Sequence, residues 1–252
     1  MIGDTHRRFP KYFQAVDNRR AWEDEADNWV KFARTPGHDA YWYYRDSFFD
    51  KIVPKPGRVT LEVGSGEGRV TRDLISRGHR VVSLDGSPTL LRHAIDLDPT
   101  LRYGLADAVN LPVRSGSIDL VVAYNSLMDF DDLPSAVDEI ARVLSDEGFF
   151  CICITHPVEY SGGFDGDDVD APYLLTHYLG ARSFDDTFTR DGITMRFRGW
   201  ARPMQEYFSA LFDAGFVVDA LQEPVPNIST GRYERWHRFP MFLHLRAIKR
   251  RA

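Results

Sequence analysis

The sequence predicts an α/β fold built on a doubly wound, mostly parallel sheet, and two observations lead to this prediction. Apolar, β-prone segments alternate with helical segments through the middle of the chain, at the spacing of parallel strands joined by right-handed crossovers. The first of these segments, residues 59–63, stops at three alternate glycines and is followed by apolar residues at helical spacing. Glycines in that context are typical of a loop that brings the backbone close to a nucleotide.

The core elements follow from this alternation. Strands are expected near residues 59–63, 80–84, 101–105, 118–123 and 148–155, with helices near residues 68–77, 88–97 and 132–144. The near-continuous apolar run at 118–123 fits a sheet that is covered on both faces. Beyond the core, residues 203–215 predict an amphipathic helix that Gly215 ends. Residues 216–221 and 239–248 are expected to close the sheet.

Three acidic residues follow successive strands and indicate which nucleotide the loop suits. Glu62 stands in the strand end, two residues before the first glycine, where a carboxylate would repel a diphosphate and attract a cationic amine. Asp85 follows 23 residues later, one strand-helix-strand step on, where an acid accepts both hydroxyls of a ribose. Asp107 follows the third strand. The implied ligand has a ribose, an amino group and no phosphate, and S-adenosylmethionine fits this description.

Five segments resemble, in order and spacing, the motifs of the class I S-adenosylmethionine-dependent methyltransferases over roughly residues 57–156. They are the glycine loop at 62–68, the ribose motif at 83–89, the adenine motif at 104–108 with 111–113, the fourth strand at 117–126, and the helix and turn at 136–148. The resemblance implies a Rossmann-like sheet of seven strands with an antiparallel last strand. It also implies S-adenosylmethionine as cofactor and S-adenosylhomocysteine as product.

The resemblance carries cofactor roles onto the matching positions. The loop amides of residues 64–66 would approach the methionyl part, Glu62 would meet its ammonium group, and Asp85 would hold the ribose hydroxyls. Asp107 and the amide after it would read the adenine edge, and Asn125 would lie under the methionyl part. The alternative for Glu62 and Asp107 is that they are ordinary polar groups at strand ends. The residues expected to contact the cofactor are Trp29, Glu62, Gly64, Ser65, Gly66, Asp85, Gly86, Ser87, Asp107, Ala108 and Asn125.

The chain is expected to form one domain, residues 1–252, in four segments. Residues 1–56 are aromatic-rich and mostly helical by pattern, which predicts an N-terminal helical cap on a cofactor-binding core at 57–156. Residues 157–202 break the alternation with a glycine- and aspartate-rich loop and short strands, and the resemblance implies that an insertion here covers the substrate. Residues 203–252 supply the C-terminal helix and the last two strands.

Aromatic side chains in the N-terminal segment have two interpretations. Trp22, Trp29 and Phe32 recur at near-helical spacing, and packing of a cap on the core accounts for most of them. Ligand pockets also use aromatic walls with few polar groups. Tyr12, Trp29 and Tyr41 are therefore candidates for the mouth of the cofactor site.

Three side chains are candidates for managing the acceptor's proton. His156 ends the fifth strand, close to where the methyl group should emerge, and an imidazole pKa near ~6.5 suits proton removal. Its alternative role is to shape the turn before Pro157. His177 in the substrate cap is a second candidate, and Asp129 after the fourth strand could steer an amine.

Composition argues against several classes of partner. The net charge is −6 and the pI about 5.7, whereas a nucleic-acid binder usually shows a basic face. The segment after strand four reads Asn-Ser-Leu-Met and lacks the Asn-Pro-Pro-Tyr of family members that methylate base or glutamine amines. No apolar run approaches the ~20 residues of a membrane span. We therefore expect no nucleic-acid partner and no membrane association.

Cysteine and histidine usage argues against a metal and for a reducing compartment. Cys151 and Cys153 lie two apart in a predicted strand, where they share a face and serve as small buried hydrophobes. The histidines are scattered, so we expect no metal site. The scarcity of cysteine and the polar N-terminus, which lacks an apolar signal core, fit a cytoplasmic protein.

The leading functional hypothesis is methyl transfer from S-adenosylmethionine to an O or N atom of a small organic molecule, such as a specialised metabolite. A nucleic-acid or protein methyltransferase is the second hypothesis, and the acidic balance and the missing amine motif weigh against it. A nicotinamide oxidoreductase on a similar sheet is the third, and Glu62 weighs against it. A non-catalytic protein that keeps the cofactor fold is the fourth, because fold does not fix function.

Overall fold

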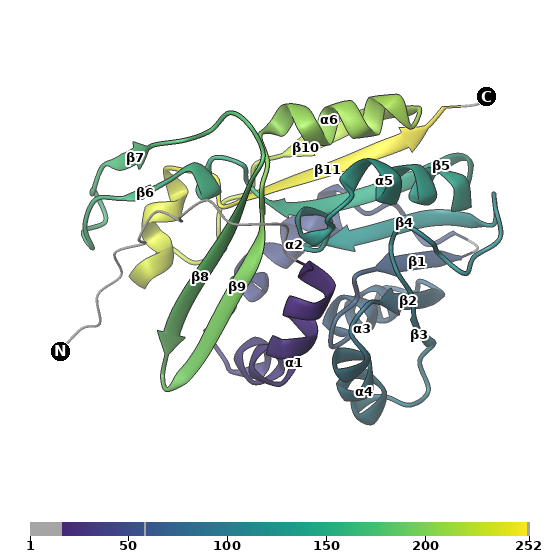
Figure 1. Ribbon diagram of the computed structural model, residues 1–252, viewed down its shortest axis with the longest axis horizontal. Coiled ribbons are helices and arrows are strands. Elements are labelled where there is room, and N and C mark those ends of the chain that lie inside the picture. Colours follow the sequence, from purple (N-terminus) through teal and green to yellow (C-terminus); the bar gives the residue numbers. More distant parts are fainter. Residues whose placement is uncertain (1–16, 58, 251–252) are drawn as a thin grey trace.

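A seven-stranded sheet forms the centre of the computed structural model, which describes residues 17–57 and 59–250. Its strands are β1 (Thr60–Val63), β2 (Val81–Asp85), β3 (Tyr103–Leu105), β4 (Ile118–Tyr124), β5 (Leu144–Thr155), β10 (Phe216–Gln222) and β11 (Phe242–Lys249). They lie in the order β10-β11-β5-β4-β1-β2-β3 (Figure 1). The first five are parallel, and β11 is antiparallel to both of its neighbours. The predicted Rossmann-like, doubly wound sheet with an antiparallel last strand is confirmed.

Helices cover both faces of the sheet because the strands are apolar on both sides. One face packs against α5 (Leu133–Val143) and α6 (Met204–Asp213), and the other against α2 (Tyr41–Lys51) and α3 (Arg69–Ser76). Side chains of β4 alternate between these two clusters, and six of its seven residues are buried. Each fully buried aliphatic side chain contributes roughly 1.5–3 kcal/mol relative to exposure.

The N-terminal segment begins with α1 (Asn18–Arg34), which packs on α4 (Pro88–Leu97) through Ala26, Val30 and Leu90. Polar contacts fix the same pair of helices, because the Glu23 carboxylate on α1 accepts a hydrogen bond from the Thr89 amide at 3.1 Å. This pairing brings one face of α1 to the edge of the sheet where the parallel strands end.

Helix boundaries follow local chemistry. Ser87 caps α4 by accepting a hydrogen bond from the Leu90 amide at 3.1 Å, and Pro88 occupies the first turn, where its missing N–H costs nothing. Helix α6 starts after Pro203 and ends before Gly215. The φ of Gly215 is +82°, in the left-handed region that favours glycine. The sequence predicted this helix within two residues at its C-terminal end.

Two hairpins occupy the segment after β5. A short 3₁₀ turn, η2 (Glu159–Ser161), leads into the first hairpin, β6 (Gly162–Phe164) with β7 (Tyr173–Leu175). The second pairs β8 (Arg182–Arg190) with β9 (Ile193–Ala201) over nine residues each. It lies against α1 and stands across the carboxyl ends of the parallel strands (Figure 1). The sequence predicted short mixed strands here, whereas the structure has one long hairpin and one short one.

Two further 3₁₀ turns complete the described elements, η1 (Leu127–Asp129) and η3 (Gly231–His237). Cys151 and Cys153 are free and fully buried in β5, as predicted for small core hydrophobes. In the part of the chain that the structure describes, no helix combines the length and the apolar character needed to cross a membrane. Within the same residues, no group of three or more His, Cys, Asp or Glu side chains is arranged to hold a metal ion.

Candidate active site

A cavity of about 1710 Å³ opens at the carboxyl ends of the parallel strands. Its walls come from α1, the loop after β1, the turn after β2, the segment after β4 and the two hairpins after β5. Single small-molecule pockets typically measure about 300–1,000 Å³, so this cavity has room for a cofactor and an acceptor side by side. All eleven residues that the sequence proposed for cofactor binding line it.

Different physical constraints favour glycine at the three alternate positions of the loop. All have φ between +54° and +82°, the left-handed region. A Cβ on Gly64 would lie 2.3 Å from the Cβ of Ser126, and one on Gly68 would lie 2.5 Å from the Tyr103 hydroxyl, so packing excludes both. A Cβ on Gly66 would meet nothing closer than the Trp29 indole nitrogen at 3.9 Å. Gly64 and Gly66 both line the cavity, but only at Gly66 is there free space for a Cβ.

The loop amides do not point at the cavity, which corrects one sequence-based expectation. The amides of Gly64 and Ser65 both donate to the Leu84 carbonyl, at 2.8 and 3.1 Å, and the Gly66 amide donates to Asp85 Oδ2 at 2.7 Å. These bonds tie the loop to β2. The loop instead offers the cavity its bare Cα surface and the buried Ser65 hydroxyl, which has no hydrogen-bond partner among the described residues.

Asp85 ends β2 and organises the two loops on either side of it. Its second carboxylate oxygen accepts from the Ser87 amide at 2.8 Å. Burial raises the pKa of Asp85, and the amide hydrogen bonds oppose that shift. The Ser87 hydroxyl donates to the Glu23 carboxylate at 2.5 Å, so this side chain joins α1 to α4 rather than projecting freely into the cavity. A Cβ on Gly86 would lie 3.0 Å from the Arg19 side chain, so this turn is also tightly packed.

Glu62 is buried beneath the loop. The Thr71 hydroxyl of α3 donates to its carboxylate and in turn lies 2.8 Å from the Ser83 hydroxyl. Burial raises the pKa of Glu62 to about 8, and the bond from Thr71 opposes the shift. A cationic ammonium group entering the cavity would favour the ionised form.

Asp107 and Ala108 form the outer end of the predicted cofactor wall. The Asp107 side chain is half exposed, accepts from the Val109 amide at 3.2 Å and lies 3.7 Å from the Arg19 guanidinium. Asn125 ends β4 with a φ of +51°, uncommon for a residue other than glycine. Its amide donates to the Cys153 carbonyl at 2.7 Å, which fixes this strained turn at the cavity wall.

His156 and His177, the two histidines proposed as a catalytic base, lie outside the cavity lining. His156 Nδ1 accepts from the Val158 amide at 3.2 Å and Nε2 lies 3.1 Å from the Glu223 carboxylate, so both ring nitrogens have partners. Burial also lowers the pKa of His156. His177 is exposed on the loop after β7.

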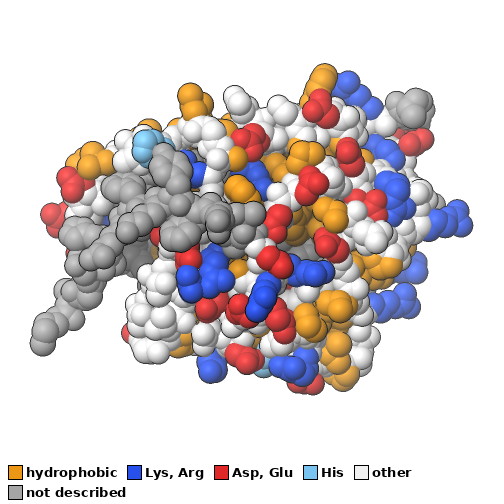
Figure 2. Space-filling model, viewed as in Figure 1, with side chains coloured by type: hydrophobic (Ala, Val, Ile, Leu, Met, Phe, Trp, Pro, Cys, Tyr) orange, Lys and Arg blue, Asp and Glu red, His pale blue; other side chains and the backbone are white. Residues whose placement is uncertain are grey.

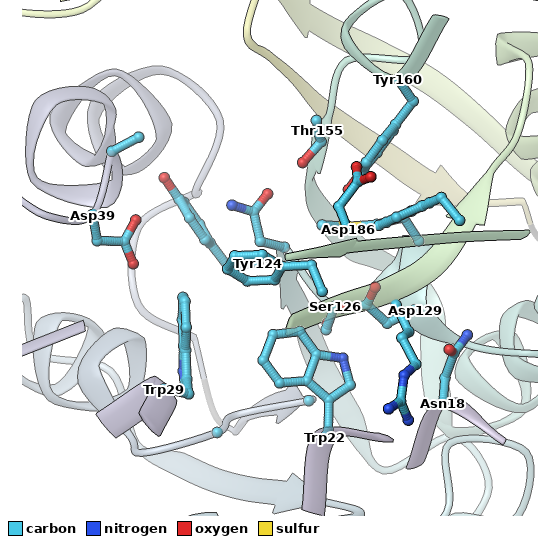
Figure 3. A pocket seen from close by; sticks show the side chains of 18 of the residues that line it. Asn18, Trp22, Trp29, Asp39, Tyr124, Ser126, Asp129, Thr155, Tyr160 and Asp186 are labelled. Carbon is cyan, nitrogen blue, oxygen red and sulfur yellow. The ribbon is translucent and has the colours of Figure 1, made fainter. Parts of the chain in front are cut away.

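Asp129 is the proposed base that does lie in the cavity. It ends η1, and the Trp22 side chain of α1 hydrogen-bonds to its carboxylate. Burial raises the pKa of Asp129 to about 8, against the opposing effects of that bond and of Arg202. Figure 3 shows Asp129 with Trp22 below it and Tyr160 on the opposite side. A carboxyl group with this pKa can both hold and release a proton near neutral pH.

The aromatic candidates divide between the cavity and the core. Trp29 lines the cavity, with the Arg69 guanidinium 5.1 Å from its ring centre. Tyr41 is fully buried and outside the cavity lining, and its hydroxyl donates to Asp73, so its predicted place at the cofactor mouth is wrong. Tyr12 lies outside the described residues.

Sequence reasoning missed several lining residues. The most informative come from distant segments: Asn18 and Trp22 on α1, Tyr160 in η2, and Asp186 on β8. Trp22 was treated only as a packing residue. Its spacing of four from Asn18 does place both on one helix face, but no local signal shows that η1 packs against that face.

Comparison with known proteins agrees with this geometry. Residues 61–152 match the family model described as a methyltransferase domain. The chain is 30% identical over 119 residues to a demethylmenaquinone methyltransferase of Corynebacterium kroppenstedtii, covering 47% of this chain and 50% of that protein. It is 26% identical over 204 residues to the mouse protein named mitochondrial arginine-hydroxylase NDUFAF5, covering 71% of this chain and 59% of that protein.

Solved structures support the fold. An S-adenosylmethionine-dependent methyltransferase from Mesorhizobium loti superposes with a TM-score of 0.67 at 22% identity, covering 84% of this chain and 98% of that one. The chain spans about half the length of the curated relatives it matches. Residues 61–152 thus match a methyltransferase domain, and proteins named as S-adenosylmethionine-dependent methyltransferases share the fold and part of the sequence.

Proposed function

We propose that this chain transfers the methyl group of S-adenosylmethionine to an N or O atom of a small organic molecule. One observation supports this most strongly. The eleven expected cofactor residues gather along one cavity that is larger than a single ligand needs, and Asp129 lies in the same cavity. The cavity thus has room for the cofactor and for an acceptor next to it.

The sulfonium methyl group is already activated, so the protein must mainly align the acceptor and exclude water. We assign Asp85 to the ribose hydroxyls, Glu62 to the ammonium group and Asp107 to the adenine edge. Gly66 would allow close approach of the cofactor, since a Cβ there would project into free space. The β8–β9 hairpin would cover the acceptor, in keeping with its position across the strand ends (Figure 1).

A small acceptor is favoured over a polymer by the shape and charge of the protein. Residues of the two hairpins wall part of the cavity. Acidic and basic side chains are interspersed on the face shown in Figure 2, without the continuous basic patch that suits nucleic acid. We further propose the four-segment division given by the sequence, and a cytoplasmic location in keeping with two free, buried thiols.

An activity other than methyl transfer is the second candidate, because one relative that covers 71% of this chain is named for arginine hydroxylation. Both candidates are compatible with a ligand in the same cavity, so binding alone does not separate them. Transfer of labelled methyl groups does.

The test uses S-adenosylmethionine carrying a deuterated methyl group and a cell extract separated into small molecules, proteins and nucleic acids. We expect label in the small-molecule fraction with the parent protein and none with Asp85→Ala. Label in protein or nucleic acid would contradict a small acceptor. Binding of S-adenosylmethionine without label in any fraction would favour the second candidate.

A further inference from the structure

The cavity is strongly acidic for a small-molecule site. Its described lining contains fourteen Asp and Glu side chains and five arginines. Such an excess attracts cations and repels anionic acceptors such as carboxylates and phenolates.

The arginines offset only part of this charge, because they are fewer than the acids and three of them pair with single acids of the lining itself. Arg69 is paired with Asp39, and Arg198 lies 3.5 Å from Asp185. Arg235 donates to the carbonyls of residues 166 and 167, at 3.2 Å each. The cofactor is itself a cation and accounts for the acids of its own wall. It does not account for Asp129, which lies on η1 beside α1 and η2.

Asp129 sits in a corner with aromatic walls. Trp22 hydrogen-bonds to the carboxylate, and Tyr160 is close enough for the Asp129 charge to raise the pKa of its phenol. Tyr160 stacks on Phe184 with ring centres 4.7 Å apart. A Cβ on Gly199 would lie 3.0 Å from both Asp129 Oδ1 and the Phe184 ring. Both side chains therefore pack against Gly199.

No cation in the described part of the chain forms an ion pair with Asp129. The nearest candidate is Arg202, whose guanidinium donates to the carbonyls of Met128, Phe130 and Asp131, at 3.0, 2.7 and 3.1 Å. Arg202 therefore holds the η1 backbone in place and leaves the carboxylate facing the cavity. A partly buried carboxylate beside aromatic rings suits an ammonium group, since ring faces also attract cations.

Asn18 supplies a second acceptor in the same corner. Its side chain is 1% exposed, and its Oδ1 has no hydrogen-bond partner among the described residues. Its Nδ2 donates to Asp131 at 2.9 Å, which fixes the orientation of the amide. Asn18 and Trp22 lie one turn apart on α1, and Figure 3 shows both beside Asp129. An unsatisfied buried acceptor costs free energy unless a ligand donates to it.

We propose that the acceptor is an amine, which binds as an ammonium cation to the Asp129 carboxylate in the corner that Trp22, Tyr160 and Phe184 wall, and is methylated on nitrogen. Its N–H groups would donate to the Asp129 carboxylate and to Asn18 Oδ1. This inference rests on the proposed function and names the class of its substrate.

The atoms and charges of this methyl transfer balance as follows. The ammonium gives one proton to the Asp129 carboxylate, which leaves a neutral amine with a free electron pair and a neutral carboxyl group. The amine nitrogen attacks the sulfonium methyl carbon, the carbon–sulfur bond breaks, and its electron pair stays on sulfur. The products are the N-methylammonium cation and the uncharged thioether of S-adenosylhomocysteine. The Asp129 proton returns to solvent when the product leaves.

Three probes with the same ring test this inference: phenethylamine, 2-phenylethanol and phenylacetate, titrated into protein saturated with S-adenosylhomocysteine. We expect phenethylamine to bind at least about tenfold more tightly than the alcohol, and phenylacetate most weakly, because only the amine gains a charge-assisted bond and cation–π contacts. Asp129→Asn should remove the amine preference and leave the alcohol unchanged. Trp22→Leu should weaken only the amine, and Asp138→Asn, an exposed charge on α5 outside the cavity, should change nothing.

The outcomes separate this inference from the proposed function. Binding of S-adenosylmethionine together with equal or better binding of the alcohol or the acid would overturn the amine acceptor alone. The same holds if phenethylamine does not bind, or if Asp129→Asn leaves its dissociation constant unchanged. Failure of S-adenosylmethionine itself to bind would overturn the proposed function first. With S-adenosylmethionine as the second ligand, mass spectrometry should detect N-methylphenethylamine from the parent protein and at least about tenfold less from Asp129→Asn.

Discussion

The Asp85 carboxylate accepts a hydrogen bond from the Gly66 amide, with 2.7 Å between Oδ2 and the nitrogen. The ribose acid and the glycine loop, two motifs 19 residues apart, are thus one unit before any cofactor binds. Asp85 also lines the cavity.

Asp85→Ala should therefore affect both binding and stability. A charge-assisted hydrogen bond contributes about 1.5–3 kcal/mol, so we expect the affinity for S-adenosylmethionine to fall about ten- to a hundredfold. The loss of the amide bonds to Gly66 and Ser87 should also lower the unfolding temperature. Calorimetry and thermal unfolding measure the two effects. Asp96→Ala, an exposed acid on α4, is the control, and equal affinities in both variants would remove Asp85 from the cofactor site.

The glycine loop offers a matched series of alanine substitutions. Gly116→Ala, with a φ of +64° and free space around it, measures backbone strain alone, about 1–2 kcal/mol. Gly66→Ala should cost a similar free energy of unfolding but weaken S-adenosylmethionine binding, because its Cβ would enter the cavity. Gly64→Ala should be more destabilising than either, by about 1–3 kcal/mol, owing to its clash with Ser126. Unfolding free energies and dissociation constants measured together test all three.

His156→Ala should leave turnover within about twofold of the parent, since a residue outside the cavity makes no contact with the reacting groups. The free energy of unfolding should fall by about 1–3 kcal/mol because the Glu223 carboxylate and the Val158 amide lose their partner. Steady-state kinetics and chemical denaturation check this. A loss of turnover of about 10² at unchanged stability would instead restore the general-base role.

Asp129→Asn should stabilise the fold in a pH-dependent way. Burial raises the pKa of Asp129 to about 8 from an ordinary value of 3.8, so between these values the folded state holds a proton that the unfolded state releases. The resulting loss of stability begins as the pH rises above about 4 and is complete above about 8. The asparagine variant escapes this loss, so its gain in unfolding temperature should be largest above pH 8, roughly 2–4 °C per kcal/mol for a chain of this size. An equal gain at pH 4 and pH 8.5 would show that Asp129 is not the responsible group.

The sequence predicted the core well because each core element carries a complete local signal. The strand before the glycines, the capping Ser87 with Pro88, and Gly215 after α6 all mark their elements within a few residues. Parallel strands joined by crossovers then have few possible arrangements. The cofactor candidates came together because they all follow strands, and strand ends meet at one edge of the sheet.

The acceptor side could not be predicted in the same way, because it is assembled from segments far apart in the chain. Asp129 from η1 meets Trp22 from α1 and Tyr160 from η2, and no periodicity links the three. His156 was misplaced because ending a strand does not determine which way a side chain turns. The Glu223 carboxylate beyond β10 draws its ring away from the cavity. One signal was available for the long hairpin: Asp191-Gly192, both at positive φ, is a favoured two-residue hairpin turn.

The most direct test of the central claim is a calorimetric titration of the parent protein with S-adenosylmethionine and, separately, with NAD. The ordered acids Glu62, Asp85 and Asp107 around one glycine loop predict one site per chain with a micromolar dissociation constant for S-adenosylmethionine and no measurable heat with NAD. Tight NAD binding without a response to S-adenosylmethionine would contradict the account.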